Sequence, residues 1–214
     1  MSTIIPQKIF MKDRLDVRIY PSRTAMGRAA AEDFKKLVQK LLQEKDYIRV
    51  VYAAAPSQDD FLSAIAADEG IDFSRIDAFH MDEYIGLDPQ APQAFGQFLR
   101  DRLFDLRRFH SVNYIEGNSG APERTAQSYA AALAEKPIDI VCMGIGENGH
   151  IAFNDPGFAL FDDPQDVKIV ALDEVCRMQQ VHDGCFETLD QVPTHALTLT
   201  VPRLMRAGAH LCIV

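Results

Sequence analysis

The sequence predicts an α/β fold: one domain over residues 1–214, with a doubly wound, mainly parallel sheet and helices on both of its faces. Two observations predict it. Short apolar segments typical of buried strands alternate with longer segments in which apolar residues recur every three or four positions, as in amphipathic helices. A chain of 214 residues, 47% of them hydrophobic and 25% charged, also has the size and composition of a single globular domain.

The predicted strands are short and apolar, and the first alternates between apolar and polar residues. They are residues 15–20, 47–55, 76–81, 111–115, 138–142, 167–172, 195–201 and 209–214. A polar loop is expected after the third strand, over residues 82–89. This order of strands is compatible with a Rossmann-like sheet.

The predicted helices lie between these strands. Ser22 precedes a long helical pattern that extends to Leu42, and Ser57-Gln-Asp-Asp60 has the spacing of a capping box at the start of a second helix. Further helices are expected at residues 95–104, 122–133 and 202–205, the fourth with Pro122 in its first turn. No helix follows the last strand, so either a further segment or a partner subunit covers it. A homo-oligomer is therefore one expectation.

The charge and the cysteines exclude several classes of protein. The net charge is −9 and Lys and Arg form no run, which disfavours nucleic acid and anionic membranes as partners. No segment is apolar enough for a signal peptide or a membrane span. The four cysteines are scattered without a CxxC pair, which favours reduced thiols in a cytoplasmic protein over disulfides or a zinc site.

The most informative segment is the glycine loop, Met143–Gly157, which follows the strand at 138–142. It contains glycines, two asparagines, two acidic residues and His150. Glycines let the backbone approach a ligand closely, and histidine transfers protons near neutral pH. A loop of this kind at the carboxyl end of a parallel strand is typical of an active site.

Part of this loop, Gly144–Gly149, also matches the dinucleotide-binding pattern G-x-G-x-x-G. That pattern requires a helix immediately after it, whereas Asn154-Asp-Pro-Gly157 opposes a helix. The glycine loop could also be a purely structural connection between two elements. We therefore expect no nucleotide or other organic cofactor.

Two more strand ends carry groups of interest. Ala53–Ser57 leads from a strand into a helix, whose free N–H groups suit a phosphate, although it also fits an ordinary helix start. Asp82 and Glu83 follow the strand at 76–81, where a carboxylate could act as a general base or simply belong to a surface loop. His80 could begin a metal site, but we expect no metal because no second ligand cluster has suitable spacing.

Taken together, three segments resemble the glucosamine-6-phosphate deaminase/isomerase family: residues 79–87, 144–156 and 191–198. The related 6-phosphogluconolactonases share the fold but differ after the histidine of the glycine loop. The resemblance implies conversion of an amino-sugar 6-phosphate and water to fructose 6-phosphate and ammonia, without a cofactor.

The resemblance also implies residue roles. Asp82 corresponds to the base that moves a proton between C2 and C1, and His150 to the residue that opens the sugar ring, supported by positions 148 and 155. The family has Asp and Glu at these two positions, whereas this sequence has Asn148 and Asp155. Asp155 is expected to orient His150 and to raise its pKa. The residues expected to bind substrate are Ala54, Ala55, Ser57, Glu83, Gly146 and Arg177, the last through the phosphate.

Two further departures from the family concern the phosphate. Ala54-Ala-Pro-Ser57 replaces a loop rich in glycine and threonine, so we expect this loop to follow a different path. The sequence also stops before a phosphate-binding lysine of the family, and apparently lacks the C-terminal segment. Two alternatives therefore stay open: a non-catalytic sugar-phosphate binding or regulatory module, and a lactonase-type hydrolase.

Overall fold

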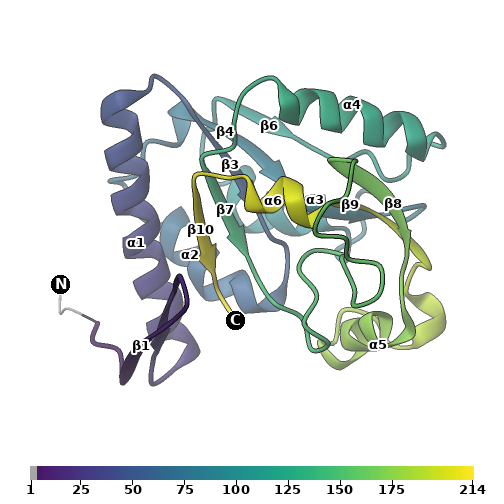
Figure 1. The fold of residues 1–214 in the computed structure, drawn as a ribbon, viewed down its shortest axis with the longest axis horizontal. Helices are drawn as coiled ribbons and strands as arrows, with labels where there is room; N and C mark the ends of the chain where they lie inside the picture. The colour runs from purple at the N-terminus through teal and green to yellow at the C-terminus, as the bar shows by residue number, and fades with distance from the viewer. Residues whose placement is uncertain (1–3) are drawn as a thin grey trace.

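The computed structural model describes residues 4–214 and confirms the predicted α/β fold, which has a parallel central sheet. Each strand of this sheet runs parallel to its neighbours, and Figure 1 shows the strands in the middle of the molecule. In spatial order they are β10 (Ala209–Cys212), β7 (Ile140–Met143), β3 (Ile48–Tyr52), β4 (Ile76–His80) and β6 (Ser111–Asn113).

Helices cover both faces of this sheet because successive side chains of a strand point to opposite sides. On one face, Val50 and Tyr52 of β3 pack with α1 (Arg23–Glu44), α2 (Asp59–Ala66) and α3 (Phe95–Leu99). On the other face, Val51 packs with α4 (Pro122–Ala134) and α6 (Val201–Met205). A π-helical turn, Arg100–Phe104, extends α3, and none of the described helices is long and apolar enough to span a membrane.

A second, antiparallel sheet lies beside the first and is seen at the right of Figure 1. It consists of β5 (Asp82–Tyr84), β9 (His195–Leu199) and β8 (Val167–Ala171), with β9 in the middle. The expected loop at residues 82–89 was therefore wrong for its first three residues. The chain turns at Met81, whose carbonyl accepts a hydrogen bond from Leu199 N at 2.8 Å, and then pairs with β9.

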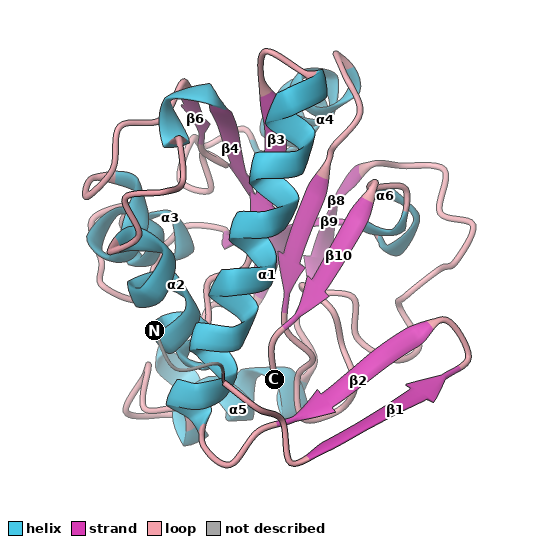
Figure 2. Ribbon diagram, turned by 90° about the vertical axis from the view of Figure 1, so that its left-hand side faces the viewer, coloured by secondary structure: helices cyan, strands magenta, loops and turns pink. Residues whose placement is uncertain are grey.

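The N-terminal hairpin stands apart from both sheets, as Figure 2 shows at its lower right. Its second strand, β2 (Leu15–Ile19), was predicted, whereas β1 (Lys8–Lys12) was not. The turn contains Asp13 with φ 53°, a left-handed conformation that Asp tolerates better than most residues.

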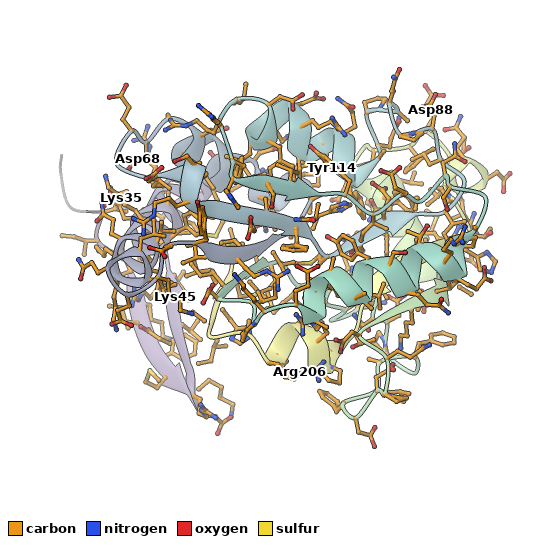
Figure 3. The ribbon with its side chains drawn as sticks, turned by 90° about the horizontal axis from the view of Figure 1, so that it is seen from above. Lys35, Lys45, Asp68, Asp88, Tyr114 and Arg206 are labelled. Carbon is orange, nitrogen blue, oxygen red and sulfur yellow. The ribbon has the colours of Figure 1, made fainter. Side chains whose placement is uncertain are left out.

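The contact between α1 and α2 fixes the loop that follows β3. Gly27 lies where a β-carbon would collide with Asp60, so its lack of a side chain lets the two helices approach closely. Lys35 of α1 also binds Asp68 just beyond α2, at 2.9 Å (Figure 3). Ser22 caps α1 as predicted, since its hydroxyl accepts from Ala25 N at 3.2 Å.

The predicted capping box at the start of α2 was wrong. Pro56–Gln58 forms a 3-10 turn, and α2 begins only at Asp59, without a side-chain cap. The hydroxyl of Ser57 instead accepts from Gln58 Nε2 at 3.1 Å. This arrangement leaves Ser57 in the loop between β3 and α2.

Candidate active site

A cavity of about 80 Å³ opens between the carboxyl ends of β3 and β7 and the start of β5. The loop after β3 contributes Ala54, Ala55 and Ser57, the start of β5 contributes Asp82, and the loop after β7 contributes Gly146 and His150. Six of the residues expected at the site line this cavity, and two more, Asn148 and Asp155, contact His150. Three segments that are distant in the sequence thus border one small space, and two of them bring a titratable group to it, Asp82 and His150.

Asp82 is the carboxylate in the wall of this cavity. Its residue is only 7% exposed, because β5 pairs with β9 and lies against the protein interior. Burial, followed by repulsion from neighbouring Glu83, raises the pKa of the Asp82 carboxyl well above its usual value. A carboxylate with a raised pKa is a stronger base, which suits it to accept a proton from a carbon atom.

Glu83 points away from Asp82, as neighbouring residues of a strand do, and does not line the cavity. Its carboxylate accepts hydrogen bonds from the backbone N–H groups of Tyr84, Phe95 and Gly96 at 2.9, 3.1 and 2.8 Å. Burial raises the pKa of Glu83 to about 6 in spite of these bonds. Its predicted contact with the substrate therefore has no support in the geometry, and Glu83 instead fixes the start of α3.

His150 is held by a network with Asn148 and Asp155. The Asn148 carboxamide oxygen lies 2.7 Å from His150 Nδ1 and also accepts from His150 N at 3.0 Å. Asn148 Nδ2 in turn donates to Asp155 Oδ1 at 2.9 Å. This pattern assigns the Nδ1 proton to the bond with Asn148 and leaves the lone pair on Nε2.

The position of Asp155 differs from the expectation. Its Oδ1 lies 3.3 Å from His150 Nδ1, so Asn148 is the nearer acceptor and Asp155 acts mainly by fixing the amide of Asn148. The expected rise in the pKa of His150 was also wrong. Burial lowers that pKa and outweighs the attraction of the Asp155 carboxylate. His150 is therefore neutral near pH 7.

Gly146 is required by the position of the histidine. A β-carbon at residue 146 would overlap the His150 ring at Cε1 and at both nitrogens. Gly149, at φ 86°, provides the left-handed turn that brings His150 back over Gly146. Within the described chain no helix lies between Met143 and Val167, so the Gly144–Gly149 segment lacks the helix that the dinucleotide-binding pattern requires.

The loop after β3 follows an extended path, and the expectation that this path differs from that of the family stays a prediction. Ala55 has φ −152° and ψ 154°, and neither Ala54 nor Ala55 adopts a left-handed conformation. Among the described residues, the lining of the cavity contains no Lys or Arg.

Arg177 does not reach the cavity. Its Nη2 donates to the carbonyls of Leu189 and Val192 at 2.7 and 2.9 Å, and it thereby connects α5 (Glu174–His182) to the segment before β9. The geometry assigns it a structural role in place of the expected phosphate contact. Helix α5 itself was not predicted from the sequence.

The same helix brings residues to the cavity that the sequence analysis missed. Gln179 and Gln180 of α5 and the following Asp183 line it, and Cys176 lies behind His150. Asp173 caps this helix by accepting from Cys176 N at 3.0 Å. Two features of the sequence could have predicted this contribution. Asp173 is a typical helix-capping residue, and Gln179 and Asp183 are four residues apart, which places them on one helical face.

The fold and this site define a class of α/β proteins in which a carboxylate and a histidine meet at the carboxyl ends of sheet strands. The chain belongs to the family of glucosamine-6-phosphate isomerases and 6-phosphogluconolactonases, whose model matches residues 21–214.

Two curated relatives are glucosamine-6-phosphate deaminases. The protein from Exiguobacterium sp. is 32% identical over 180 residues, which cover 83% of this chain and 69% of the relative. The protein from Bacillus cereus is 32% identical over 177 residues, which cover 83% of this chain and 65% of the relative. The chain thus spans about two thirds of the length of the curated relatives it matches.

Solved structures share the fold. A monomeric glucosamine-6-phosphate deaminase superposes with a TM-score of 0.80 at 24% identity, over 89% of this chain and 78% of the other. The 6-phosphogluconolactonase from Plasmodium vivax gives a TM-score of 0.75 at 13% identity, over 95% and 78%. At these identities the likeness concerns the fold alone.

Proposed function

We propose that this chain catalyses a deaminase reaction on an amino-sugar 6-phosphate, with glucosamine 6-phosphate as the substrate. Water is consumed, and fructose 6-phosphate and ammonia are formed. The observation that carries this proposal is that Asp82, a buried carboxylate with a raised pKa, and neutral His150 face one cavity. The names of the curated relatives support the choice of substrate.

The first step is ring opening at His150. Nε2 accepts the proton of the C1 hydroxyl and returns it to the ring oxygen as the bond between C1 and that oxygen breaks. Asn148 holds the proton on Nδ1 and Asp155 fixes Asn148, so Nε2 keeps the lone pair that this step needs.

The second step is proton transfer at Asp82. The carboxylate removes the proton from C2, the electron pair forms a double bond between C2 and C1, and the carbonyl electrons move to the C1 oxygen, which takes up a proton. Return of the proton from Asp82 to C1 gives a protonated imine at C2; water adds to C2 with loss of a proton, and ammonia then leaves. Burial of Asp82 favours this step because a carboxylate removed from water is more basic.

The substrate contacts that we propose come from neutral donors. Ser57 and the amides of Gln179 and Gln180 line the cavity, with the backbone of Ala54, Ala55 and Gly146 beside them. The absence of a metal or organic cofactor from the reaction, a cytoplasmic location and a homo-oligomer stay predictions.

The test measures ammonia and fructose 6-phosphate formed by the purified chain from glucosamine 6-phosphate, with Asp82→Asn as the paired variant. Equimolar products from the wild type, absent in the variant, support the proposal. Hydrolysis of 6-phosphogluconolactone in place of deamination would support the lactonase alternative. Binding of the sugar phosphate without turnover would support the binding module.

A further inference from the structure

Three side chains of the types that can bind a metal ion lie close together at the cavity. His150, Asp155 and Cys176 each offer one ligand atom, and these atoms all lie within 4.8 Å of one another. Asp155 and Cys176 are each 1% exposed, and the side chain of His150 is 11% exposed. The cluster joins the glycine loop to the first turn of α5.

The chemistry of this set is that of a zinc ligand sphere. An imidazole nitrogen, a carboxylate oxygen and a thiolate sulfur are the three ligand types that zinc combines, whereas magnesium and calcium prefer oxygen atoms only. The imidazole and the carboxylate already lie together, with His150 Nδ1 3.3 Å from Asp155 Oδ1. The Asn148 oxygen, 2.7 Å from Nδ1, lies near enough to become a fourth ligand.

We propose that His150, Asp155 and Cys176 form a binding site for a divalent cation of the zinc class, and that its occupation switches the histidine off. The cation binds Nδ1, the Asp155 carboxylate and the Cys176 thiolate. The thiol proton leaves to solvent, and the Nδ1 proton moves to Nε2. No electrons are transferred.

Metal binding is expected to inhibit ring opening because it changes the tautomer of His150. With the metal on Nδ1, Nε2 carries a proton and cannot accept one from the substrate. The binding itself is independent of the proposed function, whereas the inhibition rests on it.

The thiol makes the site selective and dependent on pH. Cys176 is 1% exposed, and a thiol must lose its proton before its sulfur can bind a metal ion. A cation must therefore displace that proton, and affinity is expected to rise with pH. Magnesium, with its preference for oxygen, is expected to bind at least tenfold more weakly than zinc.

The test titrates the chelator-treated, metal-free protein with Co²⁺, which reports thiolate ligation through a charge-transfer band and tetrahedral geometry through visible bands. Zn²⁺ is then added to displace the cobalt. We expect one equivalent of cobalt, a thiolate band, and loss of that band in Cys176→Ser. Removal of a ligand is expected to weaken zinc binding by at least the 10–100-fold that is usual for mutation of outer-shell partners.

Cys212→Ser is the matched control, because Cys212 is a free and exposed thiol of β10 and is not one of the three clustered side chains. It should retain the cobalt band. A band that persists in Cys176→Ser, or that disappears in Cys212→Ser, would overturn the proposal. Should Cys176→Ser fold poorly, the rise in Tm of the wild type with Zn²⁺, set against Mg²⁺, decides the question. Zinc binding at the cluster without any deaminase activity would refute the proposed function alone.

Discussion

The carboxamide oxygen of Asn148 lies 2.7 Å from Nδ1 of His150, closer than the Asp155 carboxylate oxygen at 3.3 Å. A neutral amide, itself fixed by a buried carboxylate, therefore sets the tautomer of the histidine. Burial lowers the pKa of the ring, and its nearest partner carries no charge that would oppose this.

The first prediction concerns this amide. In the Ser-His-Asp triad, loss of the correct tautomer costs about 10⁴ in turnover. Asn148→Ala removes the Nδ1 acceptor, so kcat for a cyclic substrate should fall roughly 10²- to 10⁴-fold, at least as much as for Asp155→Asn. Steady-state kinetics measure both. A substrate supplied in open-chain form should recover most of the loss, since it bypasses ring opening. Wild-type turnover in Asn148→Ala would contradict the assignment.

The second prediction concerns the space under the histidine. Gly146→Ala places a methyl group into the His150 ring, so the ring must move and kcat should fall by about 10²-fold, as a misplacement of roughly 1 Å does. Gly144→Ala is the matched control, because its methyl group would meet Gln58, Ser57 and Ile213 only at 3.5 Å or more. Kinetics and thermal unfolding are compared for the two variants, and equal activity in both would count against the predicted overlap.

The third prediction concerns the pH dependence of the base. Asp82 must be ionised to remove a proton, and burial and Glu83 raise its pKa, so activity should rise with pH through a midpoint well above the usual value for Asp. Glu83→Gln removes the charge contribution and should shift the acid limb of kcat/KM to lower pH. If the acid limb of kcat/KM were unchanged in Glu83→Gln, the proposed effect of Glu83 on the pKa of Asp82 would be refuted.

The raised pKa of Asp82 also affects the stability of the fold. A rise in pH should increase activity but decrease the contribution of Asp82 to stability. The fold favours the protonated carboxyl of Asp82, so its contribution is complete below the unfolded pKa of about 3.9 and is lost as pH rises through the folded pKa. Asp82→Asn should therefore increase the free energy of unfolding at pH 7 while it abolishes catalysis. Urea unfolding of the two proteins at pH 7 measures this, and a less stable variant would contradict it.

The fourth prediction concerns Arg177. Its two hydrogen bonds to Leu189 and Val192 carbonyls are structural, so Arg177→Met should lower the free energy of unfolding by about 2–4 kcal/mol. The inhibition constant for inorganic phosphate should stay within about twofold of the wild type, a free-energy change of roughly 0.4 kcal/mol. Arg28→Met, on the exposed side of α1, is the control and should change neither quantity. A large loss of phosphate affinity in Arg177→Met alone would restore its predicted role.

The sequence predicted the inner strands of the central sheet because they are buried on both faces and are rich in apolar residues, as residues 48–52 and 140–143 are. It did not predict β5, because Asp82, Glu83 and Tyr84 have the polar composition of a loop. They form a strand only through pairing with β9, more than a hundred residues further along the chain. Pairing over such a distance leaves no local signal.

The sequence likewise predicted some residues of the candidate site and missed others. The glycine loop predicted His150 as a site residue because the types of its residues are informative on their own. Glycines let the backbone approach a ligand, and a histidine among them can transfer a proton. The contribution of α5 was missed because Gln179, Gln180 and Asp183 read as an ordinary polar helical face. The direction of the His150 pKa shift was also beyond the sequence, since it depends on how deeply the ring is buried.

The most direct test of the central claim follows the proton at C2. Wild-type protein and Asp82→Asn are incubated with glucosamine 6-phosphate in D₂O, and deuterium in the sugar is measured by NMR alongside released ammonia. If Asp82 is the base, the wild type incorporates solvent deuterium and releases ammonia, and the folded variant does neither. Incorporation at the wild-type rate in Asp82→Asn would contradict the account, because another group would then move the proton.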